Sequence, residues 1–194
     1  MNHTARLTAA QETSLAIAAA VVTANAYYIH PIIALVADHF GVSHARIGLV
    51  PALNQLALAV GIFLLLPLGD RFSNRRLTMA FATGQTVSLA VMTFAQGFTL
   101  FVLGSTLLGF FTIAPYLLPA YASKRVTPER LGQVTAKLTA GVILGILVAR
   151  VGAGVVAEHF GWRAVYWAAT GLMLAVTLAP VSYTHLTLPT TVFV

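Results

Sequence analysis

The stretch PLGDRFSNRRL, residues 67–77, lies between two long apolar runs and decides the fold class of this chain. It holds Asp70, Arg71, Arg75 and Arg76, although charged residues make up only 8% of the 194 positions. The other charges are clustered too, and they leave residues 13–37, 47–69, 77–123 and 164–194 without Lys, Arg, Asp or Glu. Uncharged apolar stretches of about 20 residues can cross a bilayer as helices. The sequence therefore predicts an all-α, multi-pass membrane protein with charged loops.

The composition argues against other classes of protein. Hydrophobic residues make up 58% of the chain, and a soluble domain would carry far more polar surface. The net charge of +6 comes from short loops, with no basic face or stacking platform, so we expect no nucleic-acid partner. There is no cysteine and no HExxH, GxSxG or intramembrane carboxylate pair. We therefore expect no metal, no cofactor and no enzymatic activity.

The uncharged runs predict six transmembrane helices. The run 77–123 is too long for one crossing, and AQG at residues 95–97 predicts a turn between two of them. The first run imitates a signal peptide, with ANA at residues 24–26, but it continues through Val36, so we expect an uncleaved span. Residues 1–14 are predicted to be a cytoplasmic segment and 15–181 a six-helix bundle. The six predicted spans are Leu15–Val36, Ile47–Leu68, Leu77–Ala95, Thr99–Tyr121, Val134–Ala157 and Ala164–Val181.

The distribution of Lys and Arg predicts the orientation. With the amino terminus inside, the outer loops hold two such residues, Arg46 and Arg163. The inner segments hold eight: Arg6, Arg71, Arg75, Arg76, Lys124, Arg125, Arg130 and Lys137. Because short cytoplasmic loops concentrate positive charge, the bias of eight to two predicts that both termini are inside, N-in and C-in.

Two of the outer loops have similar sequences, ADHFGVS at residues 37–43 and AEHFGWR at residues 157–163. In each, Gly is suited to end a helix in the left-handed conformation, and His can contact the last carbonyl groups. The similarity is explained either by convergent helix caps or by an internal duplication, as in the repeats of transporter folds.

The charged stretch resembles the signature loop of the major facilitator superfamily, which joins the second and third spans. Asp70 and Arg71 match the acid and first base, and Arg75 and Arg76 match later bases, whereas Ser73 replaces the usual Gly. Residues 25–43, 126–134 and 145–167 resemble other parts of a bacterial drug- or sugar-efflux-like branch. The resemblance covers about residues 10–181, one six-helix half of a twelve-helix transporter.

The resemblance implies a secondary transporter that moves a small molecule by alternating access in the bacterial inner (plasma) membrane. It implies that Asp70, Arg71, Arg75 and Arg76 form a conformational latch; the alternative is that these charges only orient the helices. It also implies a missing carboxyl-terminal half. Efflux, with possible proton coupling, rests on the resemblance alone, and a self-assembling half-transporter or small channel is the alternative.

Polar residues inside the spans are the candidate transport residues, because polar groups are costly in the membrane. Asn25 and Tyr28 share one helix face, as do Tyr27 and His30, and Pro31 is expected to free the Tyr27 carbonyl and kink the helix. His30 could carry a proton or pack as a neutral hydrogen-bonded residue. The predicted cavity residues are Asn25, Tyr28, His30, Asn54, Gln55 and Arg150, with one of Asn54 and Gln55 facing the cavity and Gln85 and Tyr116 as weaker candidates.

The fifth span combines a cation with a face of small residues. Arg150 either extends toward the outer surface or serves a cavity or helix interface, with Glu158, a substrate anion or a missing acid as its partner. Gly141 and Gly145 are spaced for close helix packing, and Gly152 and Gly154 for flexibility. The fourth-span Arg that many relatives use in proton coupling would fall near Ser105, and it is absent.

The last residues, SYTHLTLPTTVFV at 182–194, resemble no loop of this family. They resemble a translated sequencing-adapter fragment. We therefore expect residues 182–194 to be a non-native tail on a truncated chain, with a genuine carboxyl-terminal tail as the alternative.

Overall fold

The computed structural model describes residues 7–70, 72, 74–123 and 125–187, with the backbone alone for 69–70, 74–76, 119–121 and 179–187. Within these residues the chain is helical and contains no strand. The elements are α1 (Ala9–Ala24), α2 (Ile29–Phe40), α3 (His44–Ile47), α4 (Leu49–Leu65), the 3-10 helix η1 (Leu66–Asp70), α5 (Asn74–Phe94), α6 (Phe98–Phe111), α7 (Ala114–Ser123), α8 (Pro128–Phe160) and α9 (Trp162–Thr187).

Five segments of the described chain are long and apolar enough to cross a membrane: Ala9–Phe40, His44–Leu68, Leu77–Phe94, Phe98–Leu118 and Pro128–Phe160. They coincide with the first five predicted spans, and the predicted division of residues 77–123 into two helices, each a candidate span, is confirmed. The sixth predicted span, Ala164–Val181, falls on α9 and is not among these five. Six spans therefore stay a prediction.

Local sequence sets the helix ends. The Thr8 hydroxyl accepts from Gln11 N, and Gln11 Oε1 accepts from Thr8 N at 2.9 Å, so both polar groups cap the start of α1. At the end of α2, Gly41 has φ +61° and the left-handed conformation that the sequence predicted. At the end of α8, His159 Nδ1 donates to Val155 O over 2.9 Å, as expected. Gly161 differs from the expectation, because with φ +81° and ψ 160° it is not in the left-handed helical conformation.

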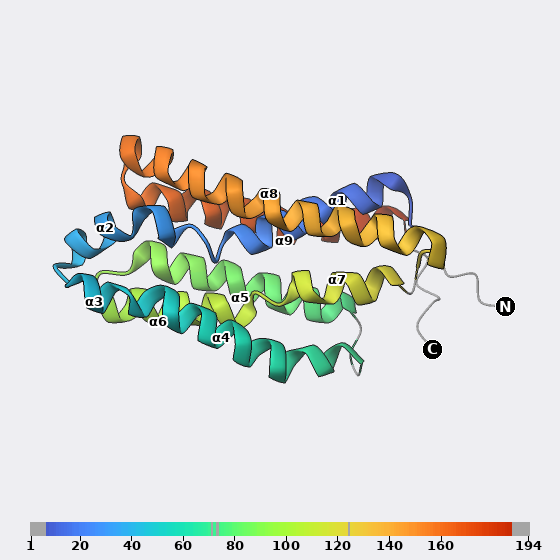
Figure 1. Cartoon of the computed structure of the whole chain (residues 1–194), viewed down its shortest axis with the longest axis horizontal. Coiled ribbons are helices and arrows are strands. Elements are labelled where there is room, and N and C mark those ends of the chain that lie inside the picture. Colours follow the sequence, from blue (N-terminus) through green and yellow to red (C-terminus); the bar gives the residue numbers. More distant parts are fainter. Residues whose placement is uncertain (1–6, 71, 73, 124, 188–194) are drawn as a thin grey trace.

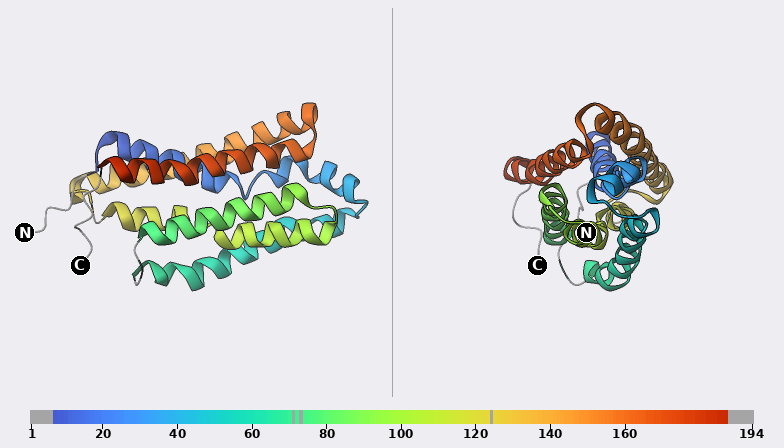
Figure 2. Two further views of the ribbon diagram at one scale, coloured as in Figure 1. Left: turned by 180° about the vertical axis from the view of Figure 1, so that it is seen from behind. Right: turned by 90° about the vertical axis from the view of Figure 1, so that its left-hand side faces the viewer.

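The helices form one elongated bundle, and the first and fifth spans pack along each other, as do the second and fourth (Figure 1). α5 packs against both α6 and α9. The start of α1, the end of α9 and the α4–α5 and α7–α8 connections all lie at one end (Figures 1 and 2). We call this the amino-terminal end. The α2–α4, α5–α6 and α8–α9 connections lie at the opposite end.

An aromatic cluster closes the core at the opposite end. Phe101, Trp162 and Tyr166 are buried, with the Phe101 ring 5.4 Å from Trp162 and 5.5 Å from Tyr166. Edge-to-face contacts of this kind add to the burial of the rings. Arg163 joins the surrounding connections, because its Nη2 donates to Ala95 O over 2.7 Å and its Nη1 lies 2.9 Å from His39 Nε2.

Candidate transport site

The first span is interrupted between α1 and α2, at residues 25–28. Pro31 has no N–H to donate to Tyr27 O, so this carbonyl accepts instead from His30 N at 3.3 Å. Tyr27 N likewise donates to Ala24 O, three residues back, at 2.9 Å. The predicted release of the Tyr27 carbonyl and the break in the helix are confirmed.

The fourth span has a matching interruption between α6 and α7, which the sequence analysis missed. Pro115 cannot donate to Phe111 O, and this carbonyl accepts from Ile113 N at 2.9 Å. The signal was a proline near the centre of an apolar run, as in the first span. Non-helical backbone within a membrane is tolerated where it is buried in protein or lines a cavity.

A buried hydrogen-bond network joins the two interruptions. Asn25 Nδ2 donates to Gln85 Oε1 at 3.3 Å, and Gln85 Nε2 donates to Thr112 Oγ1 at 2.6 Å. Asn25, Gln85 and Thr112 are at most 2% exposed. Asn25, predicted for the cavity, therefore lies inside the helix packing together with Gln85, one of the weaker candidates. Among described residues, Asn25 Oδ1 and the nearby Thr23 Oγ1 have no hydrogen-bond partner.

The adjacent residues Asn54 and Gln55 point in different directions. Asn54 is buried, and its Nδ2 donates to Ser105 O at 2.7 Å, whereas Gln55 is exposed. The Asn54 backbone also lies against Gly109, where a Cβ would come 2.1 Å from Asn54 O. Asn54 therefore contacts α6, whereas Gln55 lies on the exposed surface of α4.

Four polar side chains gather beside the first interruption. The Tyr27 and His30 rings are stacked with centroids 5.5 Å apart, and the Arg150 guanidinium lies 5.7 Å from the Tyr27 centroid. The Tyr116 phenol, from α7, is close enough to interact electrostatically with Tyr27. Tyr27 and His30 are half-buried, and Arg150 and Tyr116 are exposed. We call Tyr27, His30, Tyr116 and Arg150 the polar cluster.

Tyr28 lies apart from these contacts. It is half-buried and packs against the apolar core. The structure therefore brings together two of the six predicted cavity residues, His30 and Arg150, and adds Tyr27 and Tyr116 to them.

The glycines of α8 have two different surroundings. A Cβ on Gly141 would come 2.5 Å from Ala16 O, and one on Gly145 would come 2.4 Å from Ala20 O, so both allow close approach to α1. Around Gly152 nothing lies within 4 Å, and Gly154 has only Pro31 Cβ at 3.8 Å. Gly141 and Gly145 therefore pack directly against α1, whereas Gly152 and Gly154 do not.

The predicted latch lies at the amino-terminal end of the bundle. Asp70 ends η1, and Arg75 and Arg76 lie in the first turn of α5, with only their backbones described. Arg71 lies outside the described residues. The latch is therefore placed by backbone position only.

An ion-pair cluster that was not predicted from the sequence also lies at this end. Glu12 is 5% exposed, and its carboxylate lies 2.8 Å from Arg130 Nη2 and 3.9 Å from Lys137 Nζ. Lys137 Nζ also donates to Thr13 Oγ1 at 2.8 Å. The cluster joins the start of α1 to the first three turns of α8. The sequence signal for this cluster was the position of Glu12, an acid directly before the uncharged apolar run.

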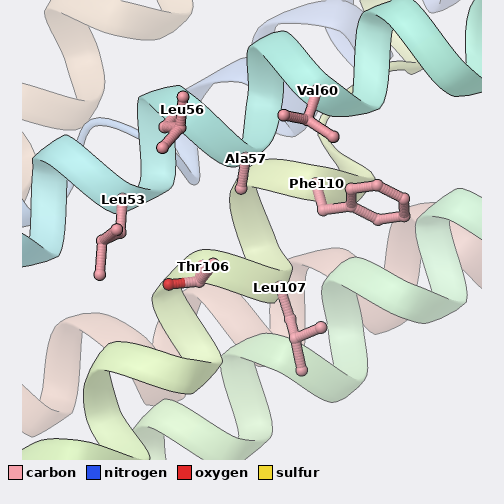
Figure 3. A pocket seen from close by; sticks show the side chains of 7 residues that line it. All are labelled: Leu53, Leu56, Ala57, Val60, Thr106, Leu107 and Phe110. Atoms are coloured by element: carbon pink, nitrogen blue, oxygen red, sulfur yellow. The ribbon is translucent and has the colours of Figure 1, made fainter.

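An open apolar pocket of about 280 Å³ lies between α4 and α6 (Figure 3). Its one polar side chain, Thr106, donates to Val102 O at 2.8 Å within its own helix. The pocket can hold hydrocarbon but offers no charged group. Its lining residues are Leu53, Leu56, Ala57, Val60, Thr106, Leu107 and Phe110.

The sequence profile described as Major Facilitator Superfamily matches residues 15–193. The chain belongs to this family. Membership in the superfamily, together with the five long apolar helices, indicates a multi-pass membrane protein.

Curated relatives of this chain are named as transporters. The chain is 33% identical over 165 residues to "Uncharacterized transporter YgaY" of Escherichia coli O157:H7. The matched region covers 85% of this chain and 42% of that relative. It is 30% identical over 165 residues to "Probable transporter SCO4007" of Streptomyces coelicolor, covering 85% of this chain and 38% of the relative. The chain thus spans about two fifths of the length of these relatives.

Proposed function

We propose that this chain forms a six-span half of a secondary active transporter, which exports a small molecule from bacteria by alternating access. The observation that carries the proposal is the pair of interrupted spans, joined by the buried network and bordered by the exposed polar cluster. Irregular backbone with polar side chains is typical of substrate sites in transporters, which place substrate near mid-depth between two halves.

The proposed orientation is N-in and C-in in the inner membrane, with α9 as the sixth span. The end of the bundle where α1 begins carries Arg125, Arg130 and Lys137 among the described cations, and the opposite end carries Arg46 and Arg163. The positive-inside tendency assigns the first of these ends to the cytoplasm. Burial lowers the pKa of the Arg125 guanidinium from its ordinary value, but an arginine remains protonated at neutral pH.

The polar cluster is an argument that another protein segment packs against the face of the bundle where Arg150 is exposed. Arg150 is a cation about 15 Å from the end of α8 at Phe160, given the rise of 1.5 Å per residue. A cation at such depth is stable when it faces protein or a water-filled cavity. We propose a carboxyl-terminal half as the partner. A second copy of this chain, as a self-assembling half-transporter or channel, is the alternative.

His30 is the proposed proton carrier. Its Nδ1 lies 3.3 Å from Tyr27 O, and because a carbonyl only accepts, Nδ1 holds the hydrogen and Nε2 can take up a proton. Imidazole is the side chain that commonly changes charge near neutral pH. Loss of the pH dependence of transport in His30→Ala would support this role, and an unchanged pH profile would rule it out.

The test of export uses a complete transporter that carries this half. Untargeted analysis of the culture medium would compare cells expressing it with cells expressing Asp70→Asn at equal membrane abundance. We expect at least one exported compound, and we expect Asp70→Asn to reduce its export because the latch is disabled. Asp38→Asn, an exposed acid at the opposite end, is the matched control. Absence of any exported compound contradicts the proposed export, and equal export by Asp70→Asn contradicts the latch.

The partner is tested separately on the chain itself. The sequence has no cysteine, so Ile143→Cys, on the exposed face of α8, provides a single oxidisable site in the membrane. A disulfide-linked homodimer would favour the self-assembling alternative, and a monomer would favour a separate carboxyl-terminal half.

A further inference from the structure

Arg150 holds its charge without a protein counter-charge in the described structure. The ion pairs among described residues join Glu12 to Arg130 and Lys137, and none of them includes Arg150. Glu158, on the same helix, is about 12 Å further along it at 1.5 Å per residue. An arginine within a bilayer is costly when it has no compensating interaction.

The contact between Arg150 and the Tyr27 ring leaves the hydrogen-bond donors of Arg150 available. The guanidinium lies 5.7 Å from the ring centroid, and no hydrogen bond from Arg150 is present among described residues. A guanidinium stacked on an aromatic ring still presents N–H groups along its edge. These groups match the two oxygens of a carboxylate as a fork. The contact with Tyr27 thus orients Arg150 and leaves its anion-binding edge unoccupied.

His30 is a second polar group that contacts the Tyr27 ring, as Arg150 does. Its ring stacks on Tyr27 at an interplanar angle of 22°, and Nδ1 is held by Tyr27 O. Its Nε2 can therefore accept from a ligand, or donate to one after protonation. One cation and one titratable ring suit a single negative charge better than a multiply charged phosphate.

We propose that Arg150, Tyr27 and His30 form a binding site for a small organic carboxylate, with Arg150 binding the carboxylate oxygens. This inference rests on the proposed transport function and narrows its substrate to organic anions. Tyr27 acts as a positioning residue for Arg150.

The test measures binding of 4-fluorobenzoate to the full chain in phosphatidylcholine nanodiscs by fluorine NMR line broadening. The neutral isostere 4-fluorobenzamide is the matched ligand. We expect saturable binding of the carboxylate and at least tenfold weaker binding of the amide. Equal binding of both ligands, or no saturable binding of the carboxylate, would overturn the carboxylate site and leave the export test untouched.

Variants separate the role of Arg150 from general effects of charge. Arg150→Gln should weaken binding at least tenfold, and Arg150→Lys should weaken it less, because an ammonium keeps the charge but not the fork. Tyr27→Leu should weaken binding through loss of positioning. Arg46→Gln is the control, since Arg46 also stacks on an aromatic ring, Phe98 at 5.2 Å, at the far end of the bundle.

Two outcomes would contradict the assignment to Arg150. The first is binding by Arg150→Gln equal to that of the unmodified chain. The second is the same loss of binding in Arg46→Gln as in Arg150→Gln. Thermal unfolding of each variant in the same nanodiscs distinguishes lost binding from lost folding, and Arg150→Lys retains a cation if Arg150→Gln fails to fold.

Discussion

Asn25 of the first span donates a hydrogen bond to Gln85 of the third span over 3.3 Å, although 60 positions separate them in the sequence. Gln85 in turn donates to Thr112 at the interruption of the fourth span. One glutamine therefore connects both irregular segments of backbone. Buried polar networks of this kind specify how helices are arranged, provided that their members are satisfied.

Gln85→Leu should destabilise the bundle, because it removes both hydrogen bonds and leaves the Asn25 amide without its partner. Interhelical hydrogen bonds in membranes average about 0.6 kcal/mol, so we expect a loss of about 1 to 2 kcal/mol for the two bonds. The free energy of unfolding in mixed detergent micelles measures it. Gln96→Leu, at an exposed position, is the control. Equal stability of the two variants would show that the network contributes nothing measurable.

Gly145→Ala and Gly152→Ala form a matched pair on one helix. A Cβ at Gly145 would lie 2.4 Å from Ala20 O, which is backbone and moves only with α1, whereas Gly152 has open space. We expect Gly145→Ala to cost about 1 to 3 kcal/mol of unfolding free energy through overpacking. Gly152→Ala should be neutral or stabilise by up to about 1 kcal/mol, because alanine favours helix. The prediction fails if both variants unfold alike.

Much of the helix arrangement could be predicted from the sequence because charge spacing and proline act locally. Gaps between charges located the five candidate spans, and Pro31 predicted a kink where the structure interrupts the first span. The sixth span falls on α9, where side chains are described only through residue 178. Its crossing therefore remains a prediction, together with the N-in and C-in orientation.

The candidate site was harder to predict, because it depends on how each helix is rotated about its axis. Asn54 and Gln55 are adjacent in the sequence, yet only Asn54 turns toward α6. Arg150 contacts Tyr27 from a distant span, and no local pattern indicates which ring it stacks on. The same holds for Glu12 and Arg130, which lie 118 positions apart.

Glu12 and Arg130 should show energetic coupling between the first and fifth spans. Glu12 is buried, but Arg130 has a side chain that is half exposed, so solvent weakens their attraction. We expect a double-mutant cycle with Glu12→Gln and Arg130→Gln to give a coupling energy of about 1 kcal/mol. The matched control is Glu158→Gln, an exposed acid near the other end of α8. A coupling energy of zero would mean that the two groups contribute independently.

Single cysteines can determine the orientation and the sixth span, because the chain has no cysteine of its own. Ser43 and Gln133 are both exposed, and they lie at opposite ends of the bundle. In intact inner-membrane spheroplasts, a membrane-impermeant maleimide should label Ser43→Cys at once. It should label Gln133→Cys only after permeabilisation, because positive charge retains that end in the cytoplasm. The reverse pattern would refute the N-in orientation.

Thr187→Cys, at the end of α9, should be labelled in the same way as Gln133→Cys, only after permeabilisation. Labelling of Thr187→Cys from outside would mean that α9 does not cross the membrane.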